Sequence, residues 1–112
     1  MRRFEKLIAA FPEQALILAH HNTYEPEVVW ALAKKYANVF ADTSFQPARV
    51  IRRAFREMGE ARVLYASDFP FSLPRYAVKA GRAATEGNPA LREKFFWRNA
   101  EALIGELPEV KG

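Results

Sequence analysis

Three short apolar runs divide the chain, and each one ends in a polar residue. The predicted strands cover about 15–19, 38–41 and 62–66, and they end at His20, Asp42 and Asp68. A short run without polar and apolar alternation is typical of a strand covered on both faces, as in a parallel sheet. We therefore predict three buried strands, each of which delivers a titratable side chain to its carboxyl end.

The segments around these runs have the three- and four-residue apolar spacing of amphipathic helices. We expect helices over about 2–10, 26–36, 47–59 and 75–85, and a last one from residue 88 onward. Thr23 is the predicted N-cap of the second helix, and Asn88 is that of the last. The positions predicted to be buried are Phe4, Leu7, Ile8 and Phe11; Val28, Val29, Leu32, Ala33 and Tyr36; Val50, Ile51, Ala54, Phe55 and Met58; and Leu91, Phe95, Phe96, Leu103 and Ile104.

Strands that alternate with amphipathic helices predict a parallel sheet with right-handed crossovers. The 112 residues suffice for a single domain, 1–112. The three strand ends should then meet at one edge of the sheet, which is where α/β folds build their sites. This favours a functional role for His20 and Asp68 over simple capping of the turns that follow the strands.

A histidine and an aspartate at one point can act as a base and its orienting partner, or as base and ligand around a metal. A catalytic zinc needs about three protein ligands and a water. Asp42 could be the third ligand, or it could cap the loop before Thr43, and His21 should point away from His20 because strand side chains alternate. A serine nucleophile is the weaker hypothesis, because neither Ser44 nor Ser67 lies in a glycine-flanked elbow.

Composition and charge narrow the function classes. Half of the residues are hydrophobic and none is cysteine, which excludes disulfides and thiolate chemistry. The net charge is +4, and arginines crowd one helix at 49, 52, 53 and 56, with further basic residues at 34, 35, 92 and 94. Because Glu57, Glu60 and Glu93 interrupt these basic residues, we interpret them as solvated helix faces and not as a nucleic-acid surface. No apolar run is long enough to span a bilayer. We expect a cytoplasmic protein that does not contact a membrane.

Four motifs give the chain a resemblance to a known family. They are LILAH at 16–20, NVFADTS at 38–44, RVLYASDFP at 62–70 and NAEALIG at 99–105. In this order they resemble the C-terminal part of the amidohydrolase-2 family, whose members are metal-dependent hydrolases and decarboxylases on a (β/α)8 barrel. The resemblance covers roughly residues 2 to 105, and it implies a partial TIM-barrel-like α/β unit with three parallel strands and four to five helices.

The resemblance also implies roles for individual residues. The three strands look like the sixth, seventh and eighth of the barrel. Asp68 then matches a metal ligand that handles the proton of the nucleophilic water, His20 matches a base or electrostatic stabiliser beside that water, and Asn99 matches a structural position. The family's His-x-His and its strand-five histidine have no counterpart in the sequence. A divalent metal, with zinc expected first, would need a site completed by another chain.

Two main functions follow from these observations. The first is a metal-dependent hydrolase or decarboxylase fragment that acts on a small molecule and is inactive as an isolated monomer. The second is a non-catalytic α/β relic of the barrel that serves assembly or binding. A three-stranded sheet leaves two unpaired edges, which proteins normally cover. We therefore expect a homo-oligomer or a complementary barrel chain as the partner.

Overall fold

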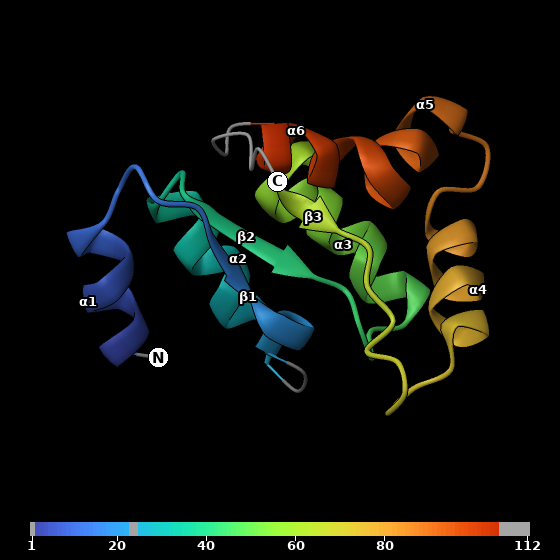
Figure 1. Ribbon diagram of the computed structural model, residues 1–112, viewed down its shortest axis with the longest axis horizontal. Helices are drawn as coiled ribbons and strands as arrows, with labels where there is room; N and C mark the ends of the chain where they lie inside the picture. Colours follow the sequence, from blue (N-terminus) through green and yellow to red (C-terminus); the bar gives the residue numbers. More distant parts are fainter. Residues whose placement is uncertain (1, 23–24, 106–112) are drawn as a thin grey trace, which may run out of the picture.

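The computed structural model describes residues 2–22 and 25–105, and it contains one parallel sheet. Its strands are β1 (Leu16–Leu18), β2 (Val39–Asp42) and β3 (Val63–Leu64), in the order β1-β2-β3 (Figure 1). Leu18 is paired with Ala41, and Ala41 with Val63. The predicted α/β class with three parallel strands is confirmed.

Strand β3 is shorter than predicted. It ends at Leu64, whose carbonyl accepts hydrogen bonds from the backbone N–H and the hydroxyl of Thr43 (3.0 and 3.2 Å). Beyond Thr43 the chain turns away from the sheet, so Tyr65 and Ala66 have no β2 backbone to pair with. The apolar run is therefore longer than the strand that it forms.

Five helices surround the sheet in the described part of the chain. They are α1 (Arg2–Ala10), α2 (Pro26–Lys35), α3 (Ala48–Met58), α4 (Pro74–Ala84), and a continuous last helix in which α5 (Pro89–Glu93) and α6 (Asn99–Gly105) are joined by a π-helical turn (Lys94–Arg98). The side chain of Asn88 accepts a hydrogen bond from the Leu91 backbone N–H, as its predicted N-cap role requires. The predicted cap Thr23 lies outside the described residues.

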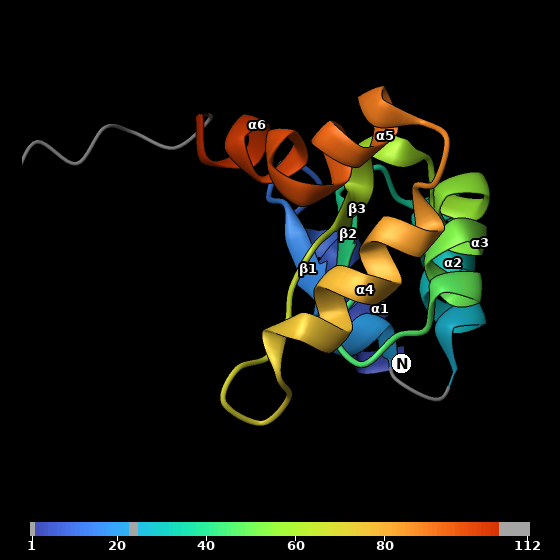
Figure 2. The ribbon, with the colours of Figure 1, turned by 90° about the vertical axis from the view of Figure 1, so that its right-hand side faces the viewer.

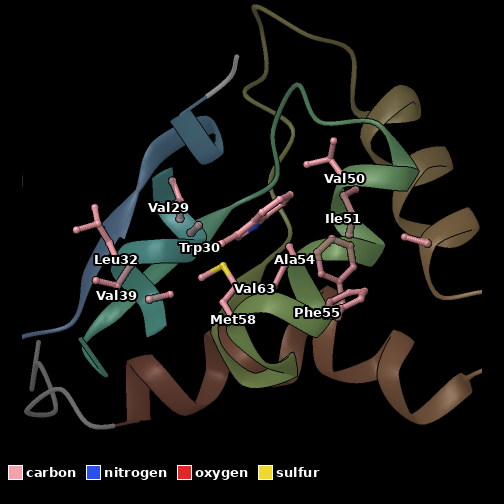
Figure 3. Packing of buried hydrophobic residues seen from close by; sticks show 14 of the residues in the cluster. Val29, Trp30, Leu32, Val39, Val50, Ile51, Ala54, Phe55, Met58 and Val63 are labelled. Carbon is pink, nitrogen blue, oxygen red and sulfur yellow. The ribbon is translucent and has the colours of Figure 1, made fainter. Parts of the chain in front are cut away.

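Helices α2 and α3 cover one face of the sheet, and the core lies between them and the strands (Figure 2). All five positions predicted on the apolar stripe of α3 are buried. Figure 3 shows the Trp30 ring of α2 directed toward Ala54 and Met58 of α3, and Val29 and Val63 belong to the same core cluster. Alternate positions of β2, Val39 and Ala41, are fully buried in this core.

The helix at the β1 side of the sheet packs less than its sequence pattern suggests. Only Ile8 of the predicted α1 face is buried, at 1% exposure, while Phe4, Leu7 and Phe11 are each more than 40% exposed. Helix α1 stands beside the sheet and not over it (Figure 1), so one side of the helix alone finds a partner. The burial predicted for these three residues is wrong.

Two further residues that were predicted to be buried are exposed. Ile17 of β1 is 52% exposed, because no helix of the described chain covers that face of the strand (Figure 2). Ile104, near the end of α6, is 65% exposed where the apolar stripe predicted burial. The described residues therefore leave apolar surface open along the β1 side and on the last helix.

Candidate functional site

His20 lies just after β1 in a tight turn (Ala19–Asn22) and has a left-handed backbone, with φ 55° and ψ 19°. This conformation costs a non-glycine residue about 1–2 kcal/mol, so its surroundings must hold it. The His20 N–H donates to Asp42 Oδ1 (3.1 Å), and Gln46 Nε2 donates to the His20 carbonyl (2.8 Å). Ring atom Nδ1 lies 2.5 Å from Ser44 Oγ. The turn after β2 thus holds both the backbone and the ring of His20.

Asp42 supplies the acceptor on which this turn depends. Its Oδ1 accepts from the Ser44 N–H (3.1 Å) and from the Ser44 hydroxyl (2.6 Å), as well as from His20. An aspartate that bonds its own backbone two residues on is a common turn device. Of the two roles left open for Asp42, capping is therefore the one that its contacts support.

Asp68 follows β3 and also has a left-handed backbone, with φ 61°. Its Oδ2 lies 4.0 Å from His20 Nε2, and the two side chains are 31% and 36% exposed. The two residues come from the outer strands β1 and β3 and meet across the end of β2. The structure thus brings together the histidine and the aspartate that the strand pattern singled out.

His21 has a different environment from its neighbour. Its side chain is fully buried, and Trp30 Nε1 donates to its Nε2 (2.9 Å). Its other ring nitrogen, Nδ1, has no hydrogen-bond partner among the described residues. Burial lowers the pKa of His21 to about 4, and the nearby Asp42 backbone offsets only part of this effect. His21 is a neutral core residue, and it points away from the site.

The geometry allows acid–base chemistry at His20 and disfavours Ser44, one of the two serines considered, as a nucleophile. Ser44 is 1% exposed and its hydroxyl hydrogen goes to Asp42, so a substrate carbonyl could not reach it. Within the described residues, no three His, Asp or Glu side chains gather closely enough to hold a metal ion. His20 and Asp68 are two possible donors and do not make a metal site by themselves.

A pocket of about 390 Å³ adjoins this site between the β2 turn and α4. Its lining consists of Thr43, Phe45, Gln46, Pro47, Ser72, Tyr76, Ala77 and Ala80. His20 and Asp68 are not among these residues. The ring of Phe45 packs edge-on against the His20 ring, with centroids 5.1 Å apart. Phe45 thus touches both the histidine and the pocket.

Comparison with known families gives the decisive observation. The family model described as amidohydrolase matches residues 1–105, nearly the whole chain. The chain belongs to the amidohydrolase family. No curated protein matches it closely enough to be compared. The membership supports a hydrolase-like function of the metal-dependent kind that this family generally has.

The structural position expected for Asn99 has support in the contacts of this amidohydrolase chain. Asn99 Nδ2 donates to the carbonyls of Glu60 and Val63 (2.6 and 3.0 Å), which is a structural contact. Helices long and apolar enough to cross a membrane do not occur in residues 2–22 and 25–105. The contacts of Ser44 and Gln46 with His20 escaped the sequence reasoning. The short spacing of Asp42, Thr43 and Ser44 is the one signal of a turn there.

Proposed function

We propose that this chain contributes a strand-eight aspartate, Asp68, and a strand-six histidine, His20, to the site of an amidohydrolase-type hydrolase or decarboxylase. The observation that carries the proposal is the 4.0 Å approach of His20 Nε2 to Asp68 Oδ2 at the carboxyl ends of two parallel strands. Family membership makes this edge of the sheet the expected place for chemistry.

In this proposal the two residues have separate tasks. Asp68 would be one ligand of a divalent metal, with zinc expected first, and would take up a proton from the attacking water. A bound metal of this kind lowers the pKa of its water and polarises the bond to be broken. His20 presents Nε2 on the Asp68 side, where it can accept or donate a proton. The remaining ligands would come from another polypeptide or a second copy, so the isolated monomer would be inactive.

Metal binding tests this proposal. The purified chain, alone and mixed with a candidate complementary chain, is dialysed against zinc or manganese and its metal content is measured. We expect stoichiometric metal only in the completed complex, and its loss in Asp68→Asn, which keeps the side-chain shape and tolerates a left-handed backbone. Glu86→Gln, an exposed carboxylate away from the site, should bind as the wild type does. A complex without stoichiometric metal would overturn the proposal.

The second candidate function is a relic domain that serves assembly or binding. It is favoured by the lack of a three-donor cluster among the described residues. Asp68→Asn separates the two functions, because a relic should keep its binding or assembly unchanged. In the relic case the completed complex would also gain no hydrolase activity from this chain.

We propose further that the open side of the sheet at β1 is covered by a second copy or by a complementary barrel chain. Ile17 of β1 and Phe4, Leu7 and Phe11 of or beside α1 form apolar surface there, and a bare sheet edge invites pairing. Sedimentation equilibrium of the wild type should show an assembly, and Ile17→Lys should shift it toward monomer. A wild type that is monomeric both alone and with candidate chains would contradict this.

A further inference from the structure

Hydrogen bonds from a single turn of the chain hold His20 at three atoms, and one of these bonds involves its ring. The contacts to Asp42 and Gln46 act on the left-handed main chain of His20. The contact between Ser44 Oγ and His20 Nδ1 (2.5 Å) adds nothing to the main chain. This contact acts on the imidazole alone, so its consequence concerns which ring nitrogen carries the hydrogen.

The direction of each hydrogen bond along this path can be assigned. Asp42 Oδ1 accepts two backbone N–H groups, and an ionised carboxylate has no hydrogen to donate. The Ser44 hydroxyl therefore donates its one hydrogen to Asp42 Oδ1 (2.6 Å). Toward His20, Ser44 Oγ can then only accept, so Nδ1 of a neutral His20 ring must carry the ring hydrogen.

We propose that Ser44 and Asp42 are positioning residues that fix His20 as the Nδ1–H tautomer, with its basic nitrogen Nε2 directed to Asp68. Which nitrogen of an imidazole is basic depends on the hydrogen bond that the other one makes. Without Ser44 the ring hydrogen can move to Nε2, and the nitrogen on the Asp68 side ceases to be a base. The tautomer does not depend on the proposed function, whereas its catalytic consequence rests on that function.

Burial supports this assignment. Ser44 is 1% exposed, so water does not compete for its hydroxyl. Gln46, whose amide holds the His20 carbonyl, is also buried. Strained backbone held by such polar contacts is characteristic of functional positions.

The tautomer can be measured directly. The chain has two histidines, so a sample with ¹⁵N-labelled histidine gives two sets of imidazole nitrogen signals, which His20→Asn assigns. At a mildly alkaline pH, above the ordinary pKa of an imidazole, we expect the wild-type His20 ring to be Nδ1–H. His21 serves as the internal reference, since Trp30 donates to its Nε2 and makes it Nδ1–H as well.

Two variants complete the test. Ser44→Ala should shift His20 to a mixture that contains the Nε2–H form and leave the His21 signals unchanged, which also shows that the fold is kept. Ser44→Thr retains the hydroxyl and should restore the wild-type signals. An Nε2–H ring in the wild type, or an unchanged His20 ring in Ser44→Ala, would overturn the proposal. The wild-type measurement decides even where a variant does not fold.

The same variant separates this inference from the proposed function. In an active, metal-loaded complex, Ser44→Ala should lower kcat by about 10- to 100-fold, the usual effect of losing a group that orients a first ligand or base. KM should change little, because Ser44 is buried and does not reach a substrate. A complex that binds no metal sinks the proposed function and leaves the tautomer measurement valid.

Discussion

The two ends of the sheet are built on opposite principles. Where the strands begin, Asn38, Arg62 and Asn99 donate hydrogen bonds to backbone carbonyls. Asn38 Nδ2 alone reaches the carbonyls of Ile8, Phe11 and Gln14, within 3.0–3.2 Å. Each of these side chains donates to main-chain carbonyls near the start of a strand, which contributes to stability.

Where the strands end, the backbone is strained. In the described part of the chain, the non-glycine residues with positive φ are His20, His21, Phe45 and Asp68, and all four follow the carboxyl end of a strand. Such conformations cost about 1–3 kcal/mol each and persist only where the surroundings impose them. The comparison teaches that this chain gains stability at one end of the sheet and keeps its chemical groups at the other. The following predictions test that division.

Arg62→Met should have the largest effect. The Arg62 guanidinium donates from Nη1 to the carbonyls of Ala33 and Tyr36 (2.9 and 3.0 Å) and from Nε to that of Met58 (3.1 Å). Losing these charged donors should lower the free energy of unfolding by about 3 kcal/mol, measured by urea denaturation. Arg56→Met, on the exposed side of α3, should change it by less than about 0.5 kcal/mol. If the two variants lowered the free energy of unfolding equally, Arg62 would not have the stabilising role assigned to this end of the sheet.

His21, at the strained end of the sheet, should make the free energy of unfolding depend on pH. Its folded pKa is about 4 and its ordinary value is 6.5, so between these values the unfolded chain binds a proton that the folded chain does not. Stability is therefore full above pH 6.5 and falls as the pH drops toward 4, by about 3 kcal/mol. Urea denaturation of the wild type and of His21→Asn across this range isolates the effect, which the variant should lack. Parallel pH curves for the two would contradict it.

Asn99→Ala should cost about 2 kcal/mol, because it removes the donor to the buried carbonyl of Val63 and to the partly buried carbonyl of Glu60. Asn88→Ala is the matched comparison, since it removes the N-cap of the same continuous helix and should cost about 1 kcal/mol. Thermal and urea denaturation of both variants provide the measurement. An Asn99 variant that is as stable as the wild type would remove the structural role assigned to this residue.

Substitutions of Asp68 should show the smallest effect and test the strain directly. With φ at 61°, glycine fits the position without a Cβ penalty, so Asp68→Gly should be more stable than Asp68→Ala by about 1 kcal/mol. Both variants lose the carboxylate and should lose any metal-dependent function equally. If the alanine variant is the more stable of the two, the backbone strain at this position has been misjudged.

The sequence predicts helices and strands more reliably than it predicts what packs against them. The α3 stripe is buried at each expected position, because both the sheet and α4 pack against that helix. The α1 stripe has the same periodicity, yet Phe4 and Leu7 are exposed, because periodicity encodes a helix face and not what lies opposite to it.

In the site, likewise, one contact could be predicted from the sequence and others could not. That His20 and Asp68 meet follows from parallel topology, which places strand ends at one edge. The bonds from Ser44 and Gln46 could not be predicted, because they require His20 to adopt a left-handed backbone that no glycine or asparagine signals.

The guanidinium of Arg62 has one further consequence, for how the chain folds. It joins the C-terminal carbonyls of α2 and of α3 within one side chain, beside the start of β2. A partly folded state in which either helix is detached leaves these groups unsatisfied. Arg62 therefore couples the two helices into one cooperative unit, and their slowest backbone amides should exchange with solvent deuterium at a common rate.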